Sequence, residues 1–148
     1  RPTVGAAACG FARRALEESI RHAGRRRQFG RPLSEFQAIR FKLADMATWL
    51  EAARLMVHRA AALLDALPEG TADDRSRLAS AKAKLYATEA AGRIADEAVQ
   101  IHGGLGVTRG QVVERIYREV RALRIYEGTS EIQRSIIARA ILRDGGPA

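Results

Sequence analysis

The chain has 148 residues, 47% of them hydrophobic, which suits one domain with a sizeable core. It holds one cysteine and no apolar run of about 18 residues, which excludes an internal disulfide framework and a membrane-spanning helix. The net charge of +8 invites a nucleic-acid function, but most basic residues alternate with acids, as on a solvated face. Only Arg25, Arg26 and Arg27 form a dense run, which fits a local anion better than a nucleic acid.

The composition predicts an all-α chain without strands, because prolines and aromatic residues are few and no long stretch alternates in Val, Ile or Thr. The first helix is expected over about residues 3–24, ending near Gly24. Its apolar stripe consists of Val4, Ala8, Phe11, Ala12, Leu16 and Ile20.

The second helix is expected to begin near Ser34, with Gln37 at capping-box spacing, and to stop at Pro68. Apolar residues recur between Phe36 and Leu67 in alternating steps of three and four. This period of 3.5 predicts a long helix that packs at a shallow angle, as in left-handed bundles.

The third helix is expected between Asp73 and Gly103, with small residues that allow close approach of a neighbour. A shorter fourth helix carries apolar residues between Val112 and Val120, and a fifth carries them between Ile132 and Ile141. Together the five helices predict an up-and-down helical bundle of the four-helix-bundle type over residues 1–148, with a frayed tail over 144–148. The abrupt helical start suggests a segment cut from a longer protein.

One stretch between the last two helices carries a candidate catalytic base. Glu127 stands before Gly128, at a loop-to-helix junction that Thr129 or Ser130 could cap. A carboxylate there can point into a cleft, where partial desolvation favours accepting a proton. From these residues alone, an exposed capping turn is the other interpretation.

Other chemistries find little support. The three histidines lie far apart in the sequence without ligand spacing, so no metal site is expected. Cys9, beside Gly10 on a helix, is expected to be a packed thiol rather than a nucleophile. The glycines after His102 follow a helix and lack a Lys-Ser/Thr ending, so they do not form a P-loop.

Several motifs, in order, resemble the carboxy-terminal domain of the acyl-CoA dehydrogenases across nearly all of the chain. They are the run Arg26–Gly30, the run Gln100–Gly104, the pair Glu114-Arg115 and the run Tyr126–Ile132 with Ile137-Ala138-Arg139. Two differences stand out. Arg118-Glu119-Val120 replaces a common Arg-Asp-Ala, and the amino-terminal helical and middle β domains of that family are absent, so the fragment alone is expected to be inactive.

The resemblance implies an FAD-dependent oxidoreductase of fatty acid metabolism that converts an acyl-CoA thioester to a trans-2-enoyl-CoA. Glu127 matches the glutamate that removes the α-proton while the β-hydride passes to the flavin, and its amide matches an oxyanion donor. The matched FAD contacts, some of them across a homodimer or homotetramer, are Arg26, Gln28, Phe29, Gln37, Gln100, Ile101, His102, Gly103, Gly104, Thr129 and Glu131. The matched substrate contacts are Arg1, Tyr126 and Gly128.

The resemblance also implies an electron-transfer flavoprotein as acceptor and a cytoplasmic location, or the mitochondrial matrix in a eukaryote. Two alternatives remain open. One keeps the fold and the flavin but is an acyl-CoA oxidase or a reductase. The other is a non-catalytic helical interaction module with no affinity for flavin or CoA.

Overall fold

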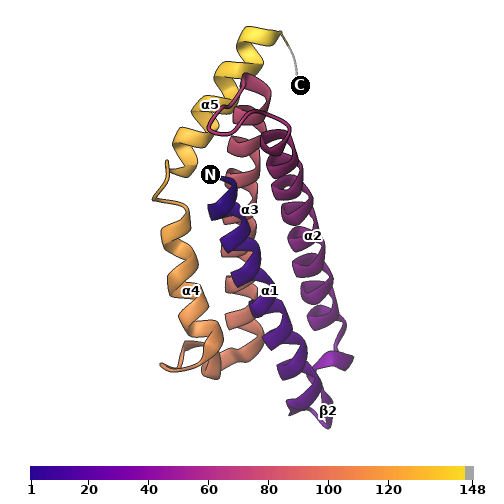
Figure 1. The fold of residues 1–148 in the computed structure, drawn as a ribbon. Coiled ribbons are helices and arrows are strands. Elements are labelled where there is room, and N and C mark those ends of the chain that lie inside the picture. Colours follow the sequence, from indigo (N-terminus) through magenta and orange to yellow (C-terminus); the bar gives the residue numbers. More distant parts are fainter. Residues whose placement is uncertain (146–148) are drawn as a thin grey trace.

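The structure is a computed structural model that describes residues 1–145. Three long helices run up and down beside one another: α1 (Pro2–Arg25), α2 (Gln37–Asp65) and α3 (Asp74–His102). Two shorter helices, α4 (Val112–Leu123) and α5 (Ser130–Asp144), lie on the side of α3 opposite α2 (Figure 1). The predicted all-α bundle of three long and two shorter helices is confirmed. None of the described helices is both long and apolar enough to cross a membrane.

The central helix of the bundle is α3, which contacts α1, α2, α4 and α5. Alanines dominate its buried surface, and α1 packs against it with a row of alanines of its own. Small side chains let two helix backbones approach closely, so the core is thin and dense. Larger side chains, Met46 on α2 and Ile94 on α3 among them, fill the spaces between the rows.

The start of α3 follows the prediction, but the start of α2 does not. Asp73 caps α3 by accepting the amide of Ser76 at 2.7 Å. Ser34 caps nothing, because it lies in a 3₁₀ turn, η1 (Leu33–Glu35), and α2 begins at Gln37 without a side-chain cap. The backbone of this turn is tied to the end of α1 instead, through the bond from the Leu33 amide to the Arg26 carbonyl at 2.8 Å.

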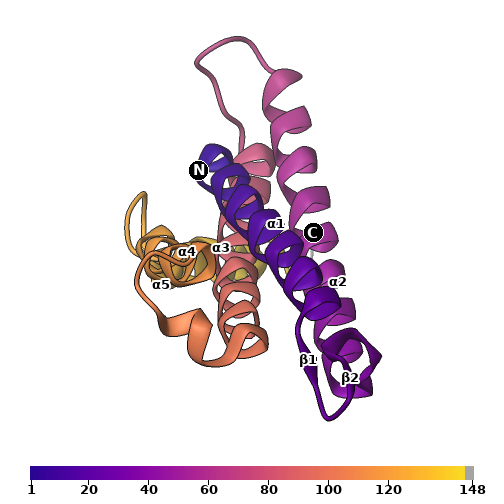
Figure 2. The ribbon, with the colours of Figure 1, turned by 90° about the horizontal axis from the view of Figure 1, so that it is seen from below.

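A small hairpin joins α1 to α2, although no strand was expected. Strand β1 (Arg27–Gln28) pairs antiparallel with β2 (Arg31–Pro32) across a two-residue turn. Both turn residues have positive φ, 51° at Phe29 and 80° at Gly30, as the tight hairpin turns that match strand twist require. The hairpin projects beyond the bundle at the start of α2 (Figure 2).

Two predicted apolar stripes are less buried than their patterns indicate. On α1 the buried face is a row of small residues that ends in Ser19 and Ala23, while Ile20 is 53% exposed. On α5 the buried residues are Ser130 and Gln133, while Ile132 is 50% exposed. Helix α5 packs mainly on α3 within this chain, so its isoleucines have little to cover them.

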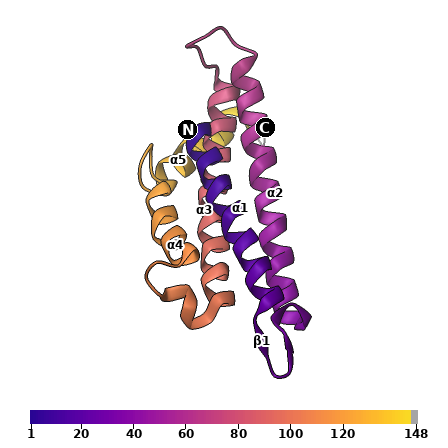
Figure 3. The ribbon, with the colours of Figure 1, turned by 60° about the horizontal axis from the view of Figure 1, so that its bottom comes forward.

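The bundle has two distinct ends (Figure 3). One end carries the hairpin, the start of α2 and the end of α3, which continues into the 3₁₀ helix η2 (Gly103–Val107). The other end carries the α2–α3 connection and the start of α1. The predicted tail is helical at Asp144 and closes on Gly145, with φ 73°, while residues 146–148 lie outside the described part of the chain.

Candidate active site

The turn between α4 and α5 holds Glu127 in an unusual backbone conformation. Glu127 and Gly128 both have positive φ, 57° and 86°. Such a conformation is strained for a glutamate and persists only where the surroundings impose it. The Glu127 side chain is exposed and forms no ion pair with the described residues. The carboxylate is therefore open to solvent in the described part of the chain and free to meet a ligand.

The surroundings that impose this conformation are two buried polar side chains beneath the turn. Lys84, on α3, is fully buried, and its Nζ donates to the carbonyls of Tyr126 at 2.8 Å and Gly128 at 2.5 Å. Gln133, on α5, is also fully buried, and its Nε2 donates to the Gly128 carbonyl at 3.0 Å. The carbonyls on both sides of Glu127 are thus held toward the core.

The position of Gly128 is restricted by this packing. A Cβ at residue 128 would lie 2.6 Å from Nε2 of Gln133, closer than real contacts allow. Glycine is therefore favoured here by the positive φ, and an added Cβ would also displace the Gln133 amide group from its place beneath the turn.

A second cluster fixes the turn from the side of α3. Glu89 accepts hydrogen bonds from the Ser130 hydroxyl at 2.7 Å and from the Arg124 guanidinium at 3.1 Å, and Arg134 lies 3.7 Å away. Burial opposes ionisation of Glu89, but these hydrogen bonds and charges outweigh it and lower the pKa of its carboxyl. One glutamate therefore joins the end of α4 and the start of α5 to α3.

The start of α5 carries two predicted cofactor contacts. Thr129 is the cap, since its hydroxyl accepts the Ile132 amide at 3.3 Å, and Ser130 is occupied by Glu89 instead. The Glu131 side chain is 78% exposed. A hydrogen bond from its own backbone amide and one with the Thr129 hydroxyl lower the pKa of Glu131, although slight burial opposes them.

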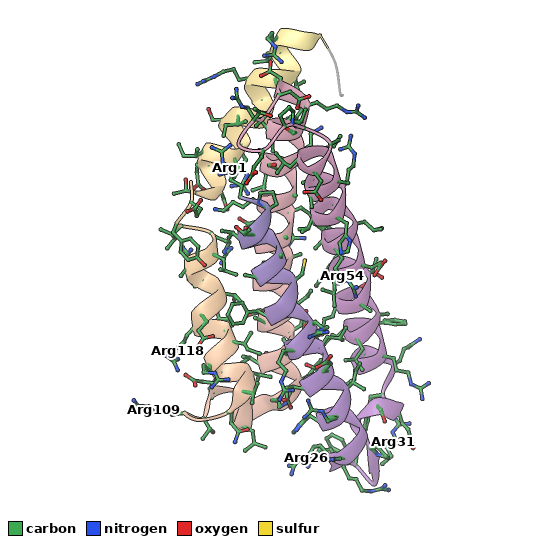
Figure 4. All side chains as sticks on the ribbon, in the orientation of Figure 1. Arg1, Arg26, Arg31, Arg54, Arg109 and Arg118 are labelled. Carbon is green, nitrogen blue, oxygen red and sulfur yellow. The ribbon has the colours of Figure 1, made fainter. Side chains whose placement is uncertain are left out.

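Two predicted substrate contacts lie near the same turn. Tyr126 is 47% exposed. Arg1 begins α1 at this end of the bundle, and its charge acts on Lys84, as that of Glu127 does (Figure 4). The structure therefore places Arg1 and the turn residues Tyr126, Glu127, Gly128, Thr129 and Glu131 in the same half of the molecule, away from the hairpin (Figure 1).

The remaining predicted cofactor contacts gather at the opposite end. Arg26 follows α1 beside the hairpin (Figure 4), and its exposed side chain has no anionic partner among the described residues. The Phe29 ring, at the hairpin tip, is 91% exposed. Gln28 is in the same hairpin, and Gln37 is exposed at the start of α2. An unpaired arginine beside an open aromatic ring fits a dinucleotide, with its pyrophosphate and planar rings.

A histidine stack joins the end of α3 to this group. The rings of His22 and His102 lie 4.2 Å apart, and His102 Nδ1 is 2.7 Å from the Ala98 carbonyl. Burial lowers the pKa of His22, and the charges of His102 and Arg26 lower it further. Of the neighbouring predicted contacts, Gln100, Gly103 and Gly104 are exposed, while Ile101 is buried at 4%.

The sequence reading of the histidines needs one correction. His22 and His102 are distant in sequence but stacked in the structure, because α1 and α3 run parallel and both residues lie at the C-terminal ends of these helices. No cluster of three or more metal-ligating side chains forms within the described residues. Burial raises the pKa of the Cys9 thiol, which opposes a nucleophilic role at neutral pH.

A well-formed hollow in the described part of the chain does not include Glu127. A cavity of about 560 Å³ lies between α3 and α4, lined among others by Arg93, Asp96, Tyr117 and Arg118. Sequence reasoning also missed Lys84, Glu89 and Gln133, which fix the turn. Of these three, only Gln133 is marked in the sequence, by its capping-box spacing from Ser130. That spacing predicts a bond from a backbone amide to the Gln133 side chain, whereas the structure has a bond from Gln133 Nε2 to the Gly128 carbonyl.

Comparison with known proteins gives one consistent result. Residues 1–142 match the family model described as acyl-CoA dehydrogenase, C-terminal domain. A probable acyl-CoA dehydrogenase of Bacillus subtilis is 47% identical over 143 residues, which are 97% of this chain and 36% of that protein. The caffeyl-CoA reductase–Etf complex subunit of Acetobacterium woodii is 44% identical over 140 residues, 95% of this chain and 35% of that protein.

The fold also matches solved structures closely. The structure of butyryl-CoA dehydrogenase from Megasphaera elsdenii superposes with a TM-score of 0.88 at 40% identity, covering 97% of this chain and 36% of that one. The chain thus spans about a third of the length of the relatives it matches.

Proposed function

This chain belongs to the acyl-CoA dehydrogenase family as a C-terminal domain, and from that premise we propose that Glu127 is the catalytic base of a flavoprotein that α,β-dehydrogenates an acyl-CoA thioester. The carboxylate takes the α-hydrogen as a proton while the β-hydrogen leaves as hydride, and the Cα–Cβ single bond becomes a trans double bond. Bound FAD would supply the hydride acceptor. The remaining parts of the active centre come from the other domains of a longer protein.

The observation that carries this proposal is the strained, clamped turn at Glu127. Two buried polar side chains hold Glu127 in a strained backbone conformation, and the result is one exposed carboxylate that forms no ion pair with the described residues. Strain of this kind concentrates at functional sites, because an ordinary capping turn does not need it. The exposure of Glu127 in the isolated chain fits a site that other domains enclose.

The same turn offers an oxyanion donor. Among the described hydrogen bonds, none is donated by the amide N–H of Glu127. A thioester α-proton becomes acidic when its carbonyl oxygen is stabilised as negative charge develops. We assign this amide as one donor to that oxygen, next to the base that removes the proton.

The two groups of predicted cofactor contacts serve two different FAD molecules. Helix α1 has 24 residues, so about 36 Å of helix separate Arg1 from Arg26. This distance exceeds the length of an extended flavin dinucleotide. Glu127 would therefore act beside one FAD, while Arg26, Phe29 and the end of α3 hold the adenosine and pyrophosphate end of another, in a homo-oligomer.

The relatives of this chain include both dehydrogenases and reductases, and they bear on the direction of the reaction and on the electron acceptor. By microscopic reversibility, a protonated Glu127 could return a proton to the α-carbon of an enoyl-CoA, as a reductase requires. An electron-transfer flavoprotein is the proposed acceptor, and this is supported by the Acetobacterium woodii relative, which is a subunit of a caffeyl-CoA reductase–Etf complex.

The decisive experiment is stopped-flow absorbance of the flavin in the full-length protein, mixed with a panel of acyl-CoAs. We expect Glu127→Gln to slow flavin reduction on the order of 10²–10⁴-fold while FAD stays bound, since general base catalysis contributes that much. Glu69→Gln is the matched control, because Glu69 also precedes a glycine of positive φ in an exposed loop.

Each other outcome rejects a specific part of the proposal. Normal reduction in Glu127→Gln would move the base elsewhere, and no reduction with any acyl-CoA would favour a reductase or a non-catalytic module. Fast reoxidation of the reduced flavin by oxygen, rather than by an electron-transfer flavoprotein, would indicate an oxidase.

A further inference from the structure

We infer that Lys84 is a positioning residue for the reaction: its buried ammonium group holds the carbonyls on both sides of Glu127 and so fixes and polarises the peptide that carries the oxyanion donor. This inference rests on the proposed function, with Glu127 as base. It adds a residue far from the turn in sequence, in the first half of the central helix α3.

The geometry places one charge under two peptide groups. Nζ of Lys84 lies 2.8 Å from the Tyr126 oxygen and 2.5 Å from the Gly128 oxygen. These two bonds span the residue between them, so the backbone of Glu127 cannot rotate without breaking one of them. The two bonds from Lys84 therefore hold Glu127 in its left-handed backbone conformation.

The peptide bond transmits this restraint to the proposed oxyanion donor. The Tyr126 carbonyl and the Glu127 amide belong to one planar peptide unit, in which C=O and N–H point in opposite directions. Fixing the carbonyl on Lys84 therefore aims the N–H away from the core. A cation at the carbonyl also polarises the unit and strengthens the hydrogen bond that its N–H donates.

Packing alone does not explain a lysine at this position. The side chain is fully buried, and taking an ammonium group out of water is costly unless its partners compensate. Burial lowers the pKa of Lys84, the charge of Glu127 opposes this, and that of Arg1 adds to it. A methionine of similar length would fill the same space without that cost, so the ammonium serves the turn rather than the core.

The test compares Lys84→Met and Lys84→Gln in the full-length, FAD-loaded protein. Lys82→Met is the matched control, since Lys82 lies on the same helix and lines a different hollow, with Asp74 and Arg59. We expect Lys84→Met to slow flavin reduction at saturating acyl-CoA about 10- to 100-fold, as a small misplacement of catalytic groups does. The dissociation constant of acyl-CoA and the FAD content should match those of Lys82→Met.

The glutamine variant separates positioning from packing. Gln is shorter and fills the space less well than Met, but it keeps an N–H donor. If Lys84 acts through its donors, Lys84→Gln should be faster than Lys84→Met; if it only packs, the order should reverse. The melting temperature of each variant is measured as well, and the reduction rates are compared at a temperature at which both variants are folded.

A second readout does not depend on turnover. Hydrogen exchange followed by mass spectrometry should show faster exchange across residues 125–130 in Lys84→Met, and no change there in Lys82→Met. Reduction rates equal to those of Lys82→Met, or the order Met faster than Gln, would overturn the inference while leaving the proposed function intact. If Glu127→Gln reduces flavin normally, the proposed function itself fails.

Discussion

Phe29 and Glu127 are the two non-glycine residues with positive φ in the described part of the chain, and both had been singled out as candidate site residues. Each precedes a glycine that also has positive φ. A bulky ring and a carboxylate are poor choices for such a conformation on steric grounds alone. Backbone strain in this molecule thus lies at the two places that the family resemblance marks as functional.

Substitution of Gly128 should disturb the turn strongly. Gly128→Ala places a Cβ against Gln133 Nε2 and a side chain at φ 86°, so we expect a loss of about 1–3 kcal/mol of stability. Gly10→Ala, where a Cβ would meet nothing within 4 Å, should instead stabilise α1 by up to about 1 kcal/mol. Chemical denaturation followed by circular dichroism measures both, and equal midpoints would contradict the argument.

At this scale, the sequence predicted the exposed groups better than the buried ones. Glu127 stands in a run of turn residues that marks it. Lys82 and Lys84, by contrast, are equivalent in the sequence, and only the fold makes one half-buried and the other fully buried. Lys84 lies three residues after Ala81 and four before Thr88, so it shares their buried face of α3, but no sequence pattern separated it from Lys82.

Among the helices, the junction of α3, α4 and α5 depends on Glu89. Its carboxylate receives the Ser130 hydroxyl and the Arg124 guanidinium, from two different segments. Removing its charge should therefore loosen the positions of α4 and α5 together, rather than unwind either helix.

This dependence should vary with pH. Glu89→Gln should cost about 1–3 kcal/mol at neutral pH, because charged partners lose their acceptor. The pKa of Glu89 is lowered by folding, so its contribution is complete above the ordinary glutamate range and disappears as pH falls through the native value. Wild-type and variant stabilities should thus converge in acid. Glu51→Gln, exposed on α2 without an ion pair among the described residues, should show no such convergence.

Helix boundaries could be predicted where a capping residue or a glycine marks the end of the helix. Asp73 and Gly103 mark the ends of α3 through a cap and a positive φ of 60°, and both predictions held. The hairpin was missed because its two-residue strands are too short for any periodicity. The predicted start of α2 at Ser34 is wrong because of the same hairpin. The hairpin is followed directly by a 3₁₀ turn that contains Ser34, so α2 begins only at Gln37.

For the molecule as a whole, the period of 3.5 in the sequence predicted the bundle, but it could not show how functional residues divide between the two ends. That division follows from the parallel course of α1 and α3, which puts His22 beside His102, and from the length of α1, which leaves Arg1 far from Arg26. Periodicity determines which face a residue occupies, while the loop geometry determines which end it reaches.

The hairpin end gives a prediction about assembly. In the full-length protein, Arg26→Ala should weaken FAD binding about 10- to 100-fold, since a charge-assisted bond contributes about 1.5–3 kcal/mol. Arg25→Ala is the control, because Arg25 is equally exposed but closes the last turn of α1. FAD retained after desalting, measured by absorbance, reports the result, and equal retention by the two variants would place the FAD elsewhere.

The roughly 36 Å between the ends of α1 has a genetic consequence. If each active centre combines the Glu127 end of one copy with the Arg26 end of another, two differently damaged genes can complement each other. A dimer of one Glu127→Gln chain and one Arg26→Ala chain would contain one doubly defective centre and one fully intact centre. Co-expression of the two defective alleles should then give a share of fully active centres that neither allele gives alone.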